Sequence, residues 1–194
     1  MCLPHTVSGQ TVRHPNERTS ELVEQFKTTT TFWQQFEVAK QIVALHDKSV
    51  LPQLEPWLSS EDMRLRGNAA FIFASLGDDR GFQVIKAILE NRSPKRAVFM
   101  SDDAGHPSPK LQIWYDRYYA ARLLGDLKDA RAVPILIPLL RDEDVKEVVP
   151  WSLGEIGDKS AIPALKEALG DDSLTMRASA LRAIEKLEGK EELP

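Results

Sequence analysis

Apolar residues recur at helical spacing along most of the chain. One such stretch places five apolar side chains on a single helix face: Leu65, Ala69, Ile72, Phe73 and Leu76. No stretch alternates apolar and polar residues with a period of two, which is the pattern typical of half-buried strands. The pattern therefore predicts an all-α fold.

Comparison of the chain with itself reveals an internal repeat. Residues 124–134 align with residues 153–163, and the same frame recurs further upstream. Successive units share one apolar anchor position, occupied in turn by Leu45, Leu76, Leu127, Ile156 and Leu187. The anchors recur with a period of about 30 residues, and an insertion of about 20 residues lengthens the second interval.

Each unit has the pattern of two helices joined by a short turn. A Gly-Asp or His-Asp pair follows the anchor, where Gly can end one helix in the left-handed conformation and Asp can cap the next. Pro52, Pro134 and Pro163 fall in the first turn of the second helices, where a missing N–H is tolerated. Pro150 falls inside a first helix, and we expect it to kink that helix.

A single helix pair cannot bury its apolar face, but stacked pairs share one continuous core. We therefore predict an α-solenoid of about four to five repeats over residues 19–194. Thr19 or Ser20 is expected to cap the first helix. Residues 1–18 hold few apolar residues and are predicted to form a flexible N-terminal arm, and residues 92–112 to form a loop inserted into the solenoid.

The units 113–144 and 145–173 resemble HEAT repeats of the short type found in phycobilisome-lyase-like proteins. The resemblance rests on residues 120–127 with 132–134, on residues 152–158 with 161–163, and on a basic residue ten positions before the anchor. That basic residue is Arg66, Arg117, Lys146 or Arg177, depending on the unit. The resemblance implies a right-handed superhelix of helical hairpins, a fold that hosts scaffolds, adaptors, bilin lyases and a few enzymes.

Composition and charge limit the classes of binding partner and the cellular compartment that we expect. The chain has 194 residues, 42% of them hydrophobic and 28% charged, which is typical of a soluble globular protein. Its net charge of −4 gives no overall attraction to nucleic acid, and no apolar run suits a signal peptide or a membrane span. The single cysteine, Cys2, excludes an internal disulfide. We expect a cytoplasmic monomer that binds neither nucleic acid nor membrane.

The sequence offers little for catalysis. The four histidines do not form the His-Glu dyads with which HEAT-type deoxyhypusine hydroxylases hold iron. Asp102, Asp103 and His106 match no metal-binding motif and are expected to belong to a polar loop. Neither a phosphate-binding glycine loop nor a nucleophile elbow is present. We therefore predict no catalytic residue, no metal and no cofactor.

The insertion lies on the one basic segment of an acidic array. Residues 63–112 contain 8 basic and 5 acidic residues, and residues 98–100 add an apolar Val-Phe-Met run outside the repeat register. The aromatic segment 113–119 follows directly. Helical spacing puts Trp114 with Tyr118 on one face and Tyr115 with Tyr119 on another. We expect one pair to pack in the core and the other to lie beneath the insertion or in an exposed binding patch.

These features favour a non-enzymatic scaffold that binds a protein partner of unknown identity. The inner face of the second helices mixes both signs of charge, which suits a protein surface better than phosphates. The residues expected to bind the partner lie on that face, on the insertion and beside it: Lys86, Glu90, Arg92, Arg96, Phe99, Trp114, Tyr115 and Arg141.

Two alternatives remain open. The first is a bilin-lyase-like tetrapyrrole-handling protein, in which Trp114, Tyr118 and Arg117 would line a cleft and bind propionates. The absence of a thiol placed to hold a chromophore argues against it. The second alternative is nucleic-acid binding through the basic segment, which fits poorly with a pI of about 5.6.

Overall fold

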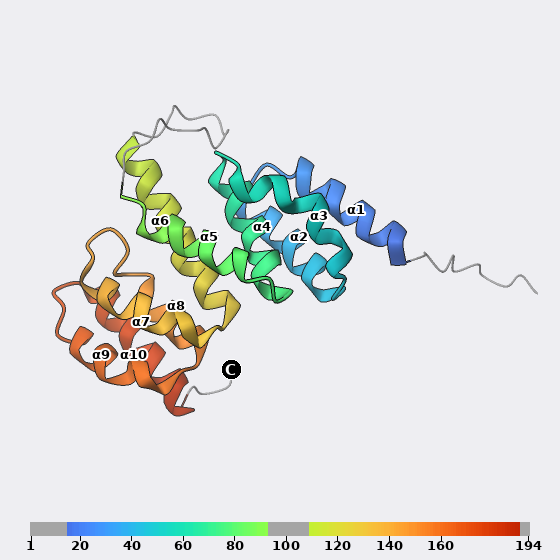
Figure 1. Cartoon of the computed structure of the whole chain (residues 1–194). Helices are drawn as coiled ribbons and strands as arrows, with labels where there is room; N and C mark the ends of the chain where they lie inside the picture. Colours follow the sequence, from blue (N-terminus) through green and yellow to red (C-terminus); the bar gives the residue numbers. More distant parts are fainter. Residues whose placement is uncertain (1–14, 93–108, 191–194) are drawn as a thin grey trace, which may run out of the picture.

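The computed structural model describes residues 15–92 and 109–190, drawn in colour in Figure 1. These residues form ten α-helices and no strand, so the predicted all-α class is confirmed. The α-helices are, from α1 to α10, Pro15–Thr28, Phe32–Ala44, Leu51–Leu54, Met63–Ser75, Asp79–Glu90, Pro109–Leu127, Val133–Leu136, Val149–Ile156, Ile162–Ala168 and Leu174–Glu188. Short 3-10 segments extend the second helices at Lys48–Val50, Glu55–Ser59, Ala130–Ala132, Ile137–Arg141 and Lys159–Ala161.

The helices stack as consecutive pairs and form the predicted α-solenoid. The first helices of the four pairs are α2, α4, α6 and α8, the second helices are α3, α5, α7 and α9, and α10 begins a fifth unit. One continuous apolar core runs through all of them, from Leu22 in α1 to Leu187 in α10. Such sharing of a core between neighbouring units is what stabilises a repeat array.

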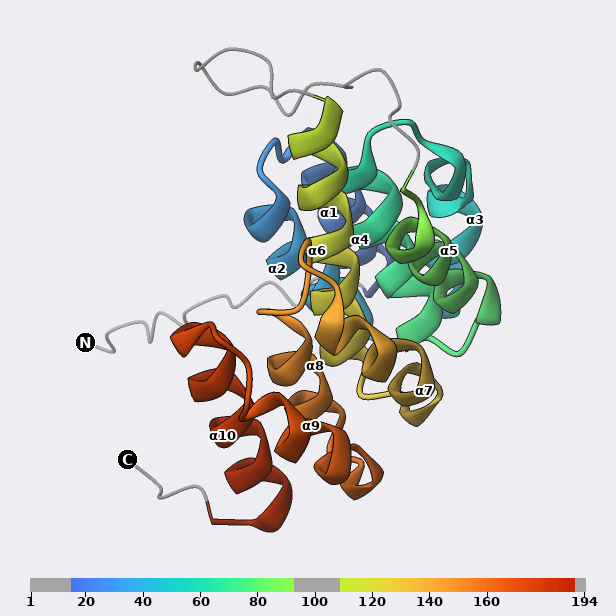
Figure 2. The same cartoon turned by 90° about the vertical axis from the view of Figure 1, so that its left-hand side faces the viewer.

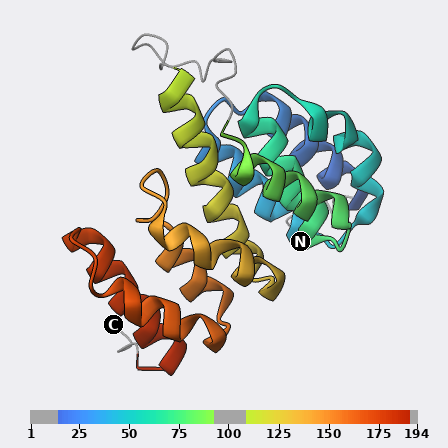
Figure 3. The same cartoon turned by 60° about the vertical axis from the view of Figure 1, so that its left-hand side comes forward.

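Helix α6 joins the two halves of the array. In Figures 1 and 3 it runs between the N-terminal helices and the group formed by α7 to α10. In Figure 2 it lies between α2 and α5, and Phe32 of α2 stacks on Tyr119 of α6 with ring centroids 4.0 Å apart. The first helix of unit one therefore touches the first helix of unit three.

The turns between paired helices follow the predicted chemistry. Gly77 and Gly157 adopt the left-handed conformation with φ of 82°. His46 and Lys128 occupy the same repeat position with φ of 54°, a conformation that is strained for residues with a Cβ. The next residue caps the second helix in all four units, where its carboxylate accepts from the N–H two residues on: Asp47, Asp78, Asp129 and Asp158.

Three prolines lie where the repeat pattern predicts them, and a fourth does not. Pro52, Pro134 and Pro163 lie in the first turn of second helices, as predicted. The predicted kink at Pro150 is wrong, because α8 begins at Val149 and Pro150 lies in its first turn. A proline there starts the helix without disturbing a hydrogen bond.

The structure differs from the predictions at the start of the first helix and at the end of the insertion. The first helix begins at Pro15, so residues 15–18 are helical, and the rest of the predicted arm lies outside the described residues. Neither Thr19 nor Ser20 caps it, since both lie inside the helix, and buried Thr19 donates to the Asp47 carboxylate at 3.3 Å. At the predicted insertion, α6 begins at Pro109, and residues 93–108 lie outside the described residues. None of the helices described is long and apolar enough to cross a membrane.

Candidate functional site

The basic residue ten positions before the anchor ties neighbouring turns together. Arg117 is 1% exposed, and its guanidinium donates to the Leu89 carbonyl at 2.9 Å, to Asp144 at 3.0 Å and to Asp142. All of these partners lie within the solenoid. Because Arg117 is buried and each guanidinium nitrogen already donates within the solenoid, its expected role in binding a propionate is not supported.

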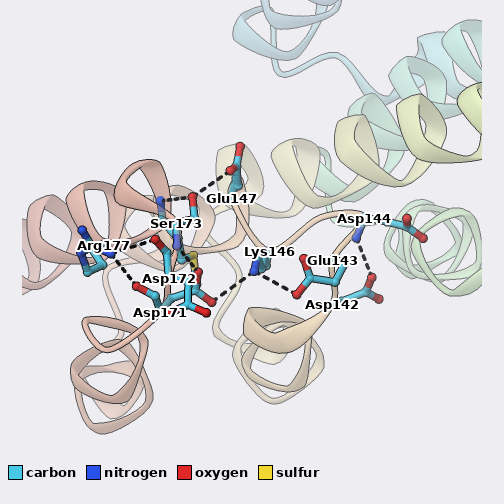
Figure 4. Close-up of polar contacts among 10 residues, drawn as sticks. Asp142, Glu143, Asp144, Lys146, Glu147, Asp171, Asp172, Ser173 and Arg177 are labelled. Atoms are coloured by element: carbon cyan, nitrogen blue, oxygen red, sulfur yellow. Dashed lines mark hydrogen bonds and ion pairs between the residues drawn. The ribbon is translucent and has the colours of Figure 1, made fainter.

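The Arg117 contacts begin a ladder of hydrogen bonds and ion pairs along the turns between units. This ladder continues into the next unit (Figure 4). Lys146 bridges Glu143 at 2.9 Å and Asp171 at 3.2 Å. Arg177 then donates to the Asp171 carbonyl at 2.7 Å. The basic residue at this repeat position thus has a structural role, because its polar contacts stabilise the turns between units.

Asp142 links this ladder to the start of the insertion. Its carboxylate accepts from Arg117 and from Arg92, which is the last described residue before the insertion. Burial pushes the pKa of Asp142 up, but the Arg117 hydrogen bonds, the Asp144 backbone N–H and both arginine charges outweigh it and hold the pKa below its ordinary value. The carboxylate is therefore charged in the folded protein at neutral pH.

Three adjoining hollows of about 500, 460 and 400 Å³ form a shallow groove along the second helices α5, α7 and α9. Pro138 lines all three. Four of the residues predicted to bind a partner line this groove: Lys86, Glu90, Arg92 and Arg141. The structure thus brings these four together on one surface, which we name the second-helix groove.

The charges of the second-helix groove are paired with one another. Arg141 pairs with Glu167 at 3.0 Å, and Lys86 lies 3.8 Å from Glu90. Arg92 is engaged by Asp142. The groove therefore combines neutralised charges with a few apolar side chains, and it offers no concentrated field to an ionic ligand.

The other predicted partner residues do not join the groove. Trp114 and Tyr115 lie on α6 and line none of the three hollows. Arg96 and Phe99 lie outside the described residues. The expected partner site is therefore divided between two surfaces.

Trp114 and Tyr115 belong to an aromatic cluster that α6 shares with α2. Trp114 stacks on Tyr118 at 5.4 Å, and Tyr115 stacks on Tyr119 at 6.2 Å. Both pairs are half-buried, so neither is wholly core nor wholly exposed. Burial raises the pKa of the Tyr119 hydroxyl, which keeps it protonated. Trp33 of α2 completes the cluster edge-on to Tyr119 at 5.5 Å, and it is 41% exposed.

An arginine extends the cluster to α8. The guanidinium carbon of Arg122 lies 3.4 Å from the ring centroid of Trp151 and 5.3 Å from that of Trp33. The first helices of units one, three and four, which are α2, α6 and α8, thus contribute to one surface. We name it the first-helix aromatic face and define it by Trp33, Tyr115, Tyr119, Arg122 and Trp151.

Sequence reasoning missed Trp33, Arg122 and Trp151, although the repeat carries a signal for two of them. The position five residues before each anchor is aromatic or basic in every unit: Lys40, Phe71, Arg122, Trp151 and Arg182. A stripe of this kind on successive first helices indicates a shared surface, because equivalent positions of stacked repeats lie side by side.

Comparisons with known proteins place the chain among HEAT-repeat proteins. A family model described as HEAT repeats matches residues 111–187. The chain is 35% identical over 116 residues to the bilin biosynthesis protein PecE of Nostoc sp. strain PCC 7120, covering 58% of this chain and 40% of that protein. It is 33% identical over 138 residues to the phycocyanobilin lyase subunit alpha of Picosynechococcus sp. strain PCC 7002, covering 69% and 44%. The chain thus spans less than half the length of these curated relatives.

A solved structure shares the fold. It is the complex of CpcE and CpcF of phycocyanin lyase from Nostoc sp. PCC7120, which matches with a TM-score of 0.52 and 20% identity over 97% of this chain and 71% of that chain.

These relatives contradict the interpretation of the chain as a non-enzymatic scaffold, since their names describe bilin biosynthesis and bilin lyases. That interpretation weighed the missing thiol too heavily, because aromatic and ionic contacts can hold a chromophore without a covalent bond. The chain carries HEAT repeats of the short, phycobilisome-lyase-like type.

Proposed function

We propose that this protein binds a linear tetrapyrrole, a bilin, without a covalent bond and presents it for a lyase-type reaction on another protein. The observation that carries the proposal is the first-helix aromatic face, where rings from α2, α6 and α8 gather and the tryptophans of α2 and α8 contact one arginine. The named functions of the relatives favour the same ligand class.

The chemistry of a bilin suits such a face. Its conjugated pyrrole rings offer flat apolar surface, which aromatic side chains bind by offset or edge-on packing. Its two propionates carry negative charge and accept hydrogen bonds, which a guanidinium can donate. Trp33 is the most exposed ring of the face and is the residue we expect to contact the pyrrole system.

The first test is a visible-absorption titration of the purified full chain with biliverdin, a linear tetrapyrrole. We expect binding to shift the visible band of the pigment. Trp33→Ala removes a ring, and an aromatic contact is worth about 0.5–1.5 kcal/mol beyond its burial, so the affinity should fall roughly tenfold.

Leu174→Ala is the matched control, because Leu174 is 72% exposed at the start of α10 and lies on no part of the aromatic face. This variant should bind the pigment as tightly as the wild type. An unshifted band at saturating pigment, or equal losses in both variants, would contradict the proposal.

We further propose that a protein partner binds the second-helix groove. The solved relative is a complex of two different chains, and the groove is lined mainly by the second helices and the turns after them, whereas the aromatic face lies on first helices. Lys86, Glu90, Arg92 and Arg141 are assigned to this contact because they line the groove. Trp114 and Tyr115 lie on α6 outside it, and Arg96 and Phe99 lie outside the described residues. Arg141→Glu should weaken capture of an apo-phycobiliprotein subunit and leave pigment binding unchanged. Equal capture by the variant and the wild type would contradict this assignment.

A further inference from the structure

Arg122 has an unusual environment for a half-buried arginine. Its guanidinium stacks directly on Trp151 and lies within cation–π range of Trp33. Its Nε is buried and has no hydrogen-bond partner. Within the described residues, no hydrogen bond or ion pair of Arg122 occupies the remaining guanidinium donors.

The other buried and half-buried arginines of the described chain behave differently. Arg64, Arg66, Arg117 and Arg177 all donate to backbone carbonyls or carboxylates. Buried donors are nearly always paired, because leaving one unpaired costs about 1–3 kcal/mol. An arginine held in place by two tryptophans with its donors unused is therefore poised for an acceptor from outside the chain.

One acid lies close to Arg122 but does not neutralise it through an ion pair. Asp126 is one helical turn further along α6, and its Oδ2 is also buried without a hydrogen-bond partner. Burial is the largest influence on Asp126 and, with the charge of Glu155, raises its pKa against the opposing charges of Arg122, Lys40 and Lys128. Glu155 itself is paired with Lys186 at 2.5 Å. The positive charge of Arg122 is thus only weakly compensated.

We infer that Arg122, clamped between Trp33 and Trp151, is a carboxylate-binding site that takes a propionate group of the bilin. This inference rests on the proposed function and names the polar contact within it. The planar guanidinium can bind both carboxylate oxygens at once, while the flanking indoles stack against the adjoining pyrrole ring. The site replaces Arg117, which is buried and whose three guanidinium nitrogens each donate within the solenoid.

The test compares biliverdin with its dimethyl ester, which keeps the conjugated rings and lacks both carboxylates. The wild type should bind the free acid roughly tenfold more tightly than the ester, since one charge-assisted bidentate contact contributes on that scale. Arg122→Met keeps an unbranched side chain between the indoles and removes the charge. It should bind the free acid about as weakly as the wild type binds the ester.

Two further variants complete the design. Arg122→Lys keeps the charge without the planar fork, so its preference for the free acid should lie between those of the wild type and Arg122→Met. Arg131→Met removes an exposed arginine that belongs to neither the aromatic face nor the groove, and it should keep the full preference. Thermal unfolding of each variant shows whether it is folded before binding is compared.

The outcomes separate this inference from the proposed function. Tight binding of both pigment forms by the wild type with equal affinity would overturn the carboxylate site and leave bilin binding in place. An undiminished preference in Arg122→Met would do the same. If Arg122→Met does not fold, Arg122→Lys and the wild-type comparison of acid with ester decide the question. Failure of the wild type to bind either form would overturn both proposals.

Discussion

Asp142 is the residue on which two neighbouring turns and the start of the insertion converge. Its carboxylate accepts from buried Arg117, from Arg92 and from the Asp144 backbone N–H, the last at 3.1 Å. A buried carboxylate is stabilising only while a cation neutralises it. Protonation of the Asp142 carboxylate therefore weakens the contact between the third and fourth units.

This contact predicts a specific acid sensitivity. The pKa of Asp142 is lower in the folded chain than its unfolded value of about 3.9, so its contribution to the free energy of unfolding is fully present above that value. The contribution is lost as the pH falls through the folded pKa. Asp142→Asn should lower the free energy of unfolding by about 2 kcal/mol at pH 7 and flatten its decline below about pH 4.

Urea denaturation between about pH 2 and pH 7 measures this prediction. Asp172→Asn is the control, because Asp172 is exposed in the next turn and no hydrogen bond of its carboxylate is found in the described part of the chain. If Asp142→Asn follows the wild-type pH profile, the contact with Arg117 does not contribute to acid stability.

Single-residue roles were only partly predictable from the sequence. The spacing to the anchor identified Arg117 as a repeated base, but its partner Asp142 lies 25 residues further along the chain. Only the folded turns show that its donors are used internally. Arg122 stands in the same helix with its donors unused, because its neighbours Trp33 and Trp151 come from α2 and α8. Contacts between distant units are not contained in the local pattern.

At the scale of the elements, the residue directly after the anchor determines how much backbone strain the turn between paired helices carries. Gly77 and Gly157 adopt positive φ without a steric penalty, whereas His46 and Lys128 adopt it with a Cβ. The side chain of Lys128 is exposed, so replacing it removes no buried contact. The third unit therefore carries local strain that a glycine would relieve.

Lys128→Gly should raise the free energy of unfolding by about 1 kcal/mol, since the left-handed conformation disfavours residues with a Cβ by about that amount. Lys166→Gly is the opposite control, because Lys166 is exposed inside α9 and glycine there should lower stability by about 1 kcal/mol. Denaturant midpoints of both variants measure the difference. Two losses of equal size would show that the positive φ of Lys128 is not a source of strain.

The elements themselves were largely predictable, because the 30-residue period and the capping aspartates mark each helix pair locally. The exception at Pro150 has a physical reason. The turn over residues 142–148 is held by the ladder of Asp142 and Lys146, which delays the start of α8 to Val149. A helix pattern read from apolar spacing alone continues through such a turn.

At the scale of the whole molecule, the array separates two surfaces. The first helices carry the aromatic face, and the second helices carry a groove whose charges are paired. The sequence predicted the groove, since equivalent positions of stacked repeats line up. The stripe five residues before each anchor signals Arg122 and Trp151, but Trp33 joins them only through the contact between the first helices of units one and three.

The most direct test of bilin binding by this array is the visible circular dichroism of biliverdin mixed with the full chain. A bilin free in solution interconverts between mirror-image helical conformations and has no net signal. Bound to one chiral site on the first-helix aromatic face, it should acquire a visible band that grows with protein and saturates at one pigment per chain. A pigment that stays without dichroism at protein excess would contradict the binding site proposed for this protein.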